Sequence, residues 1–264
     1  MAYINGANLY YEEEGSGPET LVFGHSLLLN LRMFDDQVAH LKDRYRCVRF
    51  DWRGQGHSEV TQDGYDMDSL YEDAVALIGA LDCAPCHWVG FSMGGFVGLR
   101  LAIRRPELLR SLILIDTAAT PEPLRTKLQD RLLLFIARWF GTRPVIGSVM
   151  KIFFAQKFLT DPARKAQVAE WREYLLANDR VGMEKAVNGV IRRKSVLEHI
   201  DQISLPTLII VGEEDVATTP GKSRQMHSHI PNSTLITIPD SGHVTPVEEP
   251  AAVNAALDNF LGSV

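Results

Sequence analysis

Short apolar runs alternate along most of the chain with longer segments in which apolar residues recur every three or four positions. The short runs are typical of strands and lie at residues 9–11, 20–23, 47–50, 87–91, 112–115, 206–211 and 233–238. The longer segments, at 31–41, 70–81, 93–103 and 251–261, have the period of amphipathic helices. This alternation predicts an α/β fold whose parallel strands are covered by helices on both faces.

One long segment breaks the alternation. Between residues 119 and 200 the apolar pattern is helical throughout, and no β-branched run bounded by turn residues occurs. We therefore expect a core formed by residues 1–118 and 201–264, with a helical cap, or lid, at residues 119–200 inserted between two strands.

The composition is that of an ordinary globular protein. Of 264 residues, 45% are hydrophobic and 23% are charged, and the formal net charge is −6. An acidic balance disfavours nucleic acid binding, which depends on Lys and Arg side chains that neutralise phosphates. The N-terminus lacks a basic and then apolar secretory signal, and no stretch of about 18 uncharged apolar residues occurs. These features predict a cytoplasmic protein without a membrane anchor.

Charge is distributed unevenly along the chain. Residues 121–200 contain 15 Lys and Arg against 8 Asp and Glu, a net charge of +7, which leaves −13 for the rest. A basic cap can simply complement an acidic core, or it can draw an anionic substrate towards a site beneath it. The sequence leaves both interpretations open.

The sharpest chemical signal is the G-x-S-x-G pattern from Gly90 to Gly94, between an apolar run and an apolar helical segment. A serine hydroxyl is a poor nucleophile and has to be exposed on a sharp strand-to-helix turn, where a cramped backbone demands glycine. This context predicts that Ser92 is a nucleophile at the N-terminus of a helix.

A nucleophilic serine needs a base, and the base needs a carboxylate that orients it; in this kind of sheet protein the chain order is Ser, Asp, His. Asp215 follows one predicted strand, and His243 follows the last one. Loops at the carboxyl edge of a parallel sheet converge, so these residues can meet Ser92 there. Asp116 also ends a strand and is the main rival to Asp215.

The oxyanion formed by serine attack needs two backbone N–H donors. One is expected from Met93, directly after the nucleophile, and the other from Leu27 in the loop after the strand at 20–23. His25 in the same loop either lines the pocket or only hydrogen-bonds the loop backbone.

Two further patterns suggest metal or redox chemistry only weakly. Cys83 and Cys86 have C-x-x-C spacing but stand in a turn that enters a strand, whereas a redox pair opens a helix. His227 and His229 lack a third ligand at useful spacing. We therefore expect packing cysteines, surface or packing histidines, and no metal or organic cofactor.

These segments resemble those of the α/β-hydrolase superfamily over nearly the whole chain apart from the cap. The resemblance is carried by the oxyanion loop, the turn at 51–58 (DWRGQGHS), the elbow at 90–95 and the loops of Asp215 and His243. It implies a mostly parallel sheet with a helical cap.

Smaller likenesses point to subgroups. Ser26-Leu27 with Met33-Phe34 resembles the oxyanion loop of 3-oxoadipate enol-lactonases, although His25-Ser26 stands where many relatives have His-Gly. The segments 64–68 and 91–95 are similar to those of cofactor-free haloperoxidases. N-acyl-homoserine lactonases of the α/β-hydrolase type are a third similar group.

The cap carries more apolar side chains than exposed helices need, so one face is expected either to line an apolar pocket or to pack the cap onto the sheet. These side chains are Leu132, Leu133, Leu134, Phe135, Ile136, Trp139, Phe140, Val149, Met150, Phe153, Phe154 and Phe158.

The hypothesis that follows is a serine hydrolase that cleaves carboxylic esters or lactones through an acyl-enzyme, with hydrophobic acyl substrates such as N-acyl-homoserine lactones. The alternatives are a cofactor-free perhydrolase or haloperoxidase, and a lactone-binding receptor without useful turnover. The expected partner is a small-molecule ester or lactone, and the expected state is a monomer or homodimer.

Overall fold

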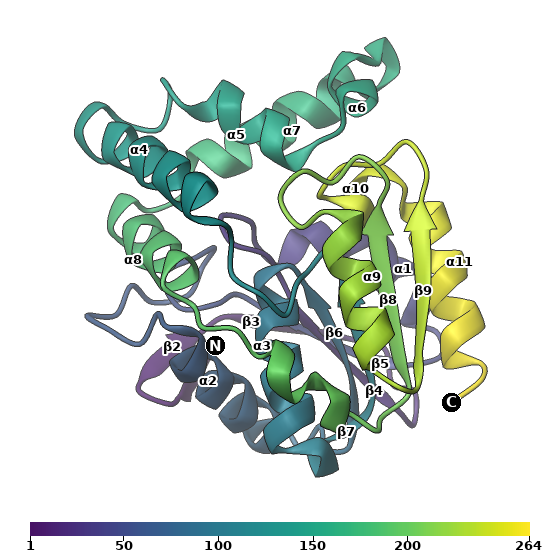
Figure 1. Cartoon of the computed structure of the whole chain (residues 1–264). Coiled ribbons are helices and arrows are strands. Elements are labelled where there is room, and N and C mark those ends of the chain that lie inside the picture. Colours follow the sequence, from purple (N-terminus) through teal and green to yellow (C-terminus); the bar gives the residue numbers. More distant parts are fainter.

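A seven-stranded sheet forms the centre of the structure, a computed structural model that describes residues 1–264 (Figure 1). Its strand order is β3-β5-β4-β6-β7-β8-β9, and only β3 runs antiparallel to its neighbour. The strands are β3 (Tyr11–Glu14), β4 (Thr20–Gly24), β5 (Arg46–Phe50), β6 (Cys86–Phe91), β7 (Leu109–Ile115), β8 (Thr207–Gly212) and β9 (Ser233–Ile238). The predicted parallel α/β sheet is confirmed.

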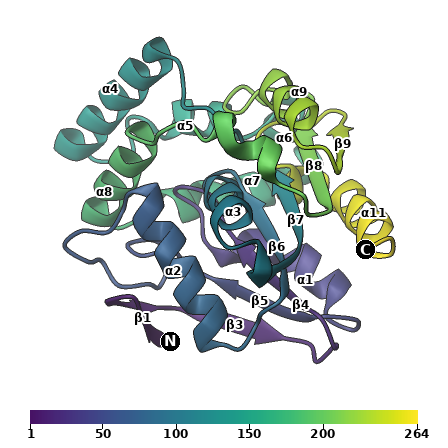
Figure 2. The same cartoon turned by 60° about the horizontal axis from the view of Figure 1, so that its bottom comes forward.

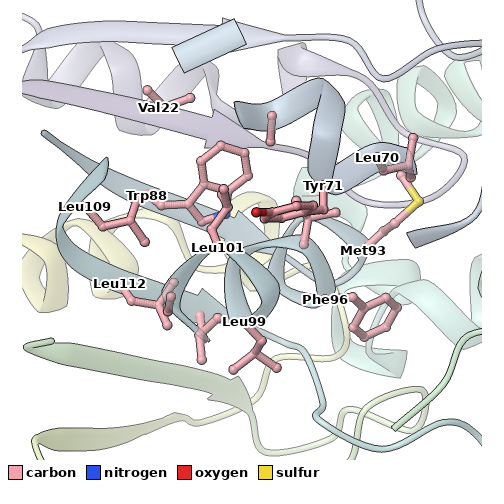
Figure 3. Packing of buried hydrophobic residues seen from close by; sticks show 14 of the residues in the cluster. Val22, Leu70, Tyr71, Trp88, Met93, Phe96, Leu99, Leu101, Leu109 and Leu112 are labelled. Atoms are coloured by element: carbon pink, nitrogen blue, oxygen red, sulfur yellow. The ribbon is translucent and has the colours of Figure 1, made fainter. Parts of the chain in front are cut away.

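Helices cover both faces of this sheet. On one face α2 (Met67–Ala80), α3 (Met93–Arg104) and α9 (Pro220–His229) contribute to one hydrophobic core, and α2 and α3 pack side by side (Figure 2). Trp88, Leu99 and Leu112 belong to it (Figure 3). On the other face α1 (Asp35–Leu41) and α11 (Pro250–Leu261) cover a second core. Because both faces are covered, the central strands are apolar runs rather than alternating ones.

The segment at residues 119–200 contains helices and no strand. It comprises α4 (Leu124–Phe140), α5 (Ile146–Phe153), α6 (Gln156–Thr160), α7 (Lys165–Leu176) and α8 (Arg180–Ile191), all between β7 and β8. Helices α4 to α7 lie at the top of Figure 1, at the end towards which the arrows of β8 and β9 point. We call residues 119–200 the cap segment. No helix of the chain combines the length and the apolar character needed to cross a bilayer.

Two predicted elements have different bounds. The expected single strand at 9–11 is wrong, because the strand is interrupted at Tyr10. The backbone N–H of Tyr10 donates to the Ser58 hydroxyl at 2.8 Å instead of to a neighbouring strand. Two separate strands result: β2 (Ala7–Leu9), which pairs with β1 (Ala2–Ile4), and β3 in the main sheet. The expected helix at 31–41 begins as a 3-10 turn, Leu31–Phe34, before α1.

The carboxyl ends of the parallel strands share one edge of the sheet. Ser92 follows β6, Asp116 follows β7, and Asp215 and His243 lie in the loops after β8 and β9. The remaining short helix, α10 (Thr245–Glu248), comes directly after the His243 loop. The topology therefore brings the predicted polar residues to one place.

Candidate active site

Ser92 stands on a sharp turn between β6 and α3. Its φ of 47° lies in the left-handed region, which is strained for a residue with a side chain. The turn is closed by glycines: a Cβ on Gly90 would lie 2.4 Å from the Gly94 carbonyl oxygen, and one on Gly94 would lie 1.9 Å from that of Gly24. The sequence around Ser92 therefore permits a turn that larger residues would block.

The hydroxyl of Ser92 is hydrogen-bonded to His243, and His243 is hydrogen-bonded to Asp215. Ser92 Oγ lies 3.0 Å from His243 Nε2, and His243 Nδ1 lies 2.9 Å from Asp215 Oδ2. All three side chains are buried. Because Asp215 accepts from Nδ1–H, Nε2 is left free to accept the serine proton.

The two candidate acids occupy different places. Asp215 contacts His243, whereas Asp116 accepts from the Gly212 backbone N–H at 2.8 Å and from the Thr245 hydroxyl at 2.5 Å. Asp116 makes no hydrogen bond to His243. The structure thus brings Asp215, and not Asp116, into line with Ser92 and His243.

Burial and charge set the protonation of this site. Burial alone would lower the pKa of His243, but Asp215, by its charge and its hydrogen bond, more than offsets this, with help from Asp116 and Glu248, so the pKa is raised above 6.5. Burial would raise the pKa of Asp215, yet His243 and Thr218 keep it below its ordinary value. Burial, and then Asp215, raise the pKa of Asp116 well above its ordinary value. Asp215 is therefore the ionised partner of His243.

The two predicted oxyanion donors are available. Met93 is the first residue of α3, so its backbone N–H has no acceptor within the helix. The Leu27 N–H makes no hydrogen bond within the chain, although its loop is tied to the elbow, because the Gly94 N–H donates to the His25 carbonyl at 3.2 Å. Both N–H groups are therefore free to donate to an oxyanion.

The His25 ring hydrogen-bonds the backbone around its loop and does not line the cavity described below. Its ring is fully buried, Nδ1 lies 2.7 Å from the Ser26 carbonyl, and Nε2 accepts from the Trp52 backbone N–H at 3.0 Å. Burial lowers its pKa, so the ring is neutral. Of the two interpretations offered for His25, the backbone one describes this arrangement.

The cysteines lie in the protein interior, and the paired histidines lie on its surface. Cys83 and Cys86 are free and buried, at the turn that enters β6, and burial raises the pKa of the Cys83 thiol to about 11. His227 and His229 lie exposed on α9, where they bond Ser233 and Gln225. No group of three or more His, Cys, Asp and Glu side chains is placed to hold a metal ion.

A cavity of about 130 Å³ opens next to these residues, and 13 of its 15 lining residues are hydrophobic. It begins at Leu27 and Phe153 and extends between α4, α5, α7 and α8. Phe153 adjoins the histidine: its carbonyl accepts the His243 backbone N–H at 2.9 Å, and the two rings are 5.8 Å apart. The cavity therefore leads from the neighbourhood of His243 into the cap segment.

The apolar side chains of the cap segment divide into three groups. Leu133, Leu134, Val149 and Phe153 line the cavity. Met150, Phe154 and Phe158 are buried in the core, and Ile136 packs, half-buried, against a small cluster that contains Val145. Four members of the set are instead exposed: Leu132, Phe135, Trp139 and Phe140. Leu132, Phe135 and Trp139 lie on the face of α4 opposite the cavity residues, and Phe140 is its last residue.

Several side chains that support the site were not predicted. Thr218 donates to Asp215 Oδ2 at 2.7 Å, and Gln55 and Asn178 hold the backbone N–H and carbonyl of Leu28, beside Leu27. The Asp-x-x-Thr spacing after β8 is the usual signal of a side-chain turn and could have indicated Thr218. The partners of Leu28 come from distant segments, so no local pattern indicates them.

Glu248 is the least expected of these. Its buried carboxylate accepts backbone N–H groups from Gly242 at 3.0 Å, Val244 at 3.1 Å and Ala155 at 2.8 Å. Burial raises the pKa of Glu248 to about 7, although these hydrogen bonds oppose the shift. The side chain thus ties both neighbours of His243 to the cap segment.

Known proteins share this fold over nearly the whole chain. Residues 19–250 match the family model described as the alpha/beta hydrolase fold. The chain belongs to this family. This α/β hydrolase is 30% identical to 3-oxoadipate enol-lactonase 2 of Acinetobacter baylyi, over 91% of its own length and 88% of the relative's length.

Two further comparisons agree with this assignment. The crystal structure of the enol-lactonase from Burkholderia xenovorans LB400 superposes with a TM-score of 0.92 at 26% identity and covers 99% of both chains. A protein named as a non-heme bromoperoxidase, BpoC of Mycobacterium tuberculosis, is 29% identical over 97% of this chain and 98% of its own length. The relatives support a hydrolase of small molecules, as the sequence predicted.

Proposed function

We propose that this α/β hydrolase is a serine hydrolase that cleaves carboxylic esters or lactones through an acyl-enzyme. The observation that carries the proposal is the hydrogen-bonded chain from Ser92 through His243 to Asp215, with distances of 3.0 and 2.9 Å. Nucleophile, base and orienting acid in reach of one another are the arrangement that acyl transfer requires.

In the first half-reaction the Ser92 oxygen attacks the substrate carbonyl while its proton passes to His243 Nε2. The oxyanion is bound by the N–H groups of Leu27 and Met93, each of which lowers the barrier by about 3 kcal/mol. The carbon–oxygen bond of the ester or lactone then breaks, and the leaving alkoxide takes the proton from His243. Water repeats the sequence on the acyl-enzyme, which releases the acid and restores the Ser92 hydroxyl.

The cavity supports an apolar acyl or ring substituent. Its volume of about 130 Å³ is close to that of an apolar cavity that binds benzene, so it suits a group of about six heavy atoms. None of its lining residues is Lys, Arg or His. A short N-acyl-homoserine lactone or a comparable hydrophobic lactone or ester fits this lining better than an anionic substrate does.

We also propose that residues 119–200 act as a lid domain over a core of residues 1–118 and 201–264. Basic residues of the cap segment pair with acidic residues of the core, since Lys157 lies 2.7 Å from Asp240 and Arg164 lies 3.4 Å from Glu249. These pairs favour the interpretation in which the basic cap complements an acidic core, rather than one in which it attracts an anion.

The test is acid release at constant pH from p-nitrophenyl esters of increasing chain length and from γ-lactones, including N-acyl-homoserine lactones. We expect Ser92→Ala to reduce turnover at least about ten-thousand-fold, because the members of such a triad act as a unit. Esterase activity that survives in Ser92→Ala would overturn the assignment. Tight lactone binding with turnover slower than about once per hour would instead favour a receptor, since enzymes typically turn over about 1–1000 times per second.

A second candidate is perhydrolysis, in which peroxide replaces water in the attack on the acyl-enzyme. The similarity to a protein named as a bromoperoxidase favours perhydrolysis over a receptor role. Acetate-dependent bromination of a dye in the presence of peroxide, lost in Ser92→Ala, would support this activity. Its absence would leave hydrolysis alone.

A further inference from the structure

One acidic side chain stands in the otherwise apolar cavity. Asp130 and Thr142 are the two polar residues among the 15 that line it. Asp130 lies in the middle of α4, away from the N-cap where Asp would stabilise the helix. Its side chain makes no hydrogen bond or ion pair within the chain, so it contributes no bond that holds the fold together.

The surroundings of Asp130 leave its charge uncompensated. Burial, and then the neighbouring Glu122 carboxylate, raise the pKa of Asp130 to about 6, and Arg193 opposes them. Arg193 is itself engaged by Glu122 and by the Thr120 carbonyl. On α8, which packs against α4, Glu184 bonds Arg138 and Lys185 bonds the Thr61 carbonyl. At neutral pH the carboxylate is therefore mostly ionised and lacks a cation of its own.

We propose that Asp130 is the far end of the substrate pocket and binds a protonated amine carried at the end of a short acyl chain. A charge among apolar groups is costly unless it is paired, and a ligand ammonium would provide both the opposite charge and the hydrogen bond. The apolar lining between Leu27 and Asp130 would cover the methylene groups of the chain. This inference rests on the proposed hydrolase function and narrows its substrate class.

The experiment uses three p-nitrophenyl esters whose acyl tails have nearly the same shape but differ in charge. They are the 6-(dimethylamino)hexanoate, the 7-methyloctanoate and the heptanedioate monoester, which end in an ammonium, an isopropyl group and a carboxylate. Shorter homologues of each ester test whether a shorter acyl tail places its terminal group closer to Asp130. We expect kcat/KM for the ammonium ester to exceed that for the isopropyl ester by about tenfold or more, the size of one charge-assisted hydrogen bond, with the carboxylate ester poorest.

Asp130→Asn should abolish the preference for the ammonium ester, so that kcat/KM for the ammonium and isopropyl esters becomes equal within about threefold. Glu173→Gln removes an equal charge from an exposed position on α7 and should preserve the preference. In the wild type the preference should weaken below about pH 6, where Asp130 is protonated while the amine stays charged. A preference that Asp130→Asn leaves intact would overturn the proposal, as would a wild type that does not distinguish the three tails.

Binding separates this inference from the proposed function. Calorimetry with hexyldimethylamine, which has no ester, should show about tenfold weaker binding to Asp130→Asn than to the wild type. If no ester is turned over but this difference is present, the hydrolase proposal fails and the amine site stands. If esters are hydrolysed through Ser92 but the amine binds both proteins equally, the amine site fails alone.

Discussion

His243 lies among three buried acidic side chains that differ in their bonding. Asp215 bonds the imidazole directly, Asp116 is tied to Gly212 and Thr245, and Glu248 accepts the backbone N–H groups on either side of His243. Three full negative charges in so small a volume would repel one another, and the raised pKa values of Asp116 and Glu248 avoid this. Asp215 is thereby left as the main ion facing the imidazole.

The raised pKa of His243 predicts how activity depends on pH. In the proposed mechanism neutral His243 is the base, so kcat/KM should rise with pH through a midpoint above 6.5 and fall away below it. Asp215→Asn removes the stabilising charge, so this midpoint should move to lower pH while the plateau drops about ten-thousand-fold. A pH profile of both proteins on one ester measures the shift.

Asp116→Asn is the matched control for that substitution. Asp116 directly follows the neighbouring strand β7 but makes no hydrogen bond to His243, so its loss should lower the kcat/KM plateau by less than about tenfold. If Asp116→Asn were the more damaging change, Asp116 rather than Asp215 would be the orienting acid.

At the scale of elements, α4 presents two apolar faces. At about 100° per residue, Leu124, Leu128, Leu132, Phe135 and Trp139 fall within about 80° of one another, and the cavity residues lie on the opposite side. Trp139 is 65% exposed, whereas Ala137 on the cavity side is 4% exposed. Replacing leucine by alanine is therefore expected to have different effects on the two faces.

Leu134→Ala and Leu132→Ala form a matched pair on this helix. Leu134 lines the cavity, so shortening it should lower kcat/KM for six- to eight-carbon acyl esters by about tenfold and have little effect on acetate esters. Leu132 is exposed, and its truncation should leave both rates unchanged. Steady-state kinetics across the chain-length series would test this, and equal effects at both positions would show that the cavity does not hold the acyl chain.

The sequence predicts most elements because their patterns are local. The strands on both sides of Ser92 are continuous apolar runs, and the elbow needs glycine at fixed positions, so both can be recognised without any distant partner. The pattern does not indicate helix α9, because Met226 is its one buried apolar side chain and the remainder is polar. Both faces of α4 carry apolar side chains, so its periodicity does not indicate which face meets the cavity.

At the scale of the whole molecule, the cap segment and the sheet share one hydrophobic core. Phe154, Phe158 and Trp171 belong to the same cluster as Phe23 and Phe91 of the sheet. Glu248 and Asn178 add hydrogen bonds across the same boundary. The boundaries at residues 119 and 200 follow from a change of periodicity, but periodicity carries no information on whether two parts share a core.

This shared core predicts that the cap segment and the sheet unfold together. Phe154 is 3% exposed and stacks on Phe158 at 4.8 Å, so Phe154→Ala should lower the free energy of unfolding by about 3–5 kcal/mol. For a chain of this size that is a fall in Tm of about 10 °C, and calorimetry should show it as one shifted transition.

Phe140→Ala provides the control, because Phe140 lies in the same segment but is 72% exposed, and its Tm should match that of the wild type. If Phe154→Ala instead split the trace into two transitions and shifted only the earlier one, the cap segment would be a separate unit that opens alone. In that case the cavity and the hydrogen bond from Asn178 to the Leu28 carbonyl would be lost while the sheet stayed folded. Activity would then disappear at the earlier transition. With one cooperative core, activity and the sheet are lost together.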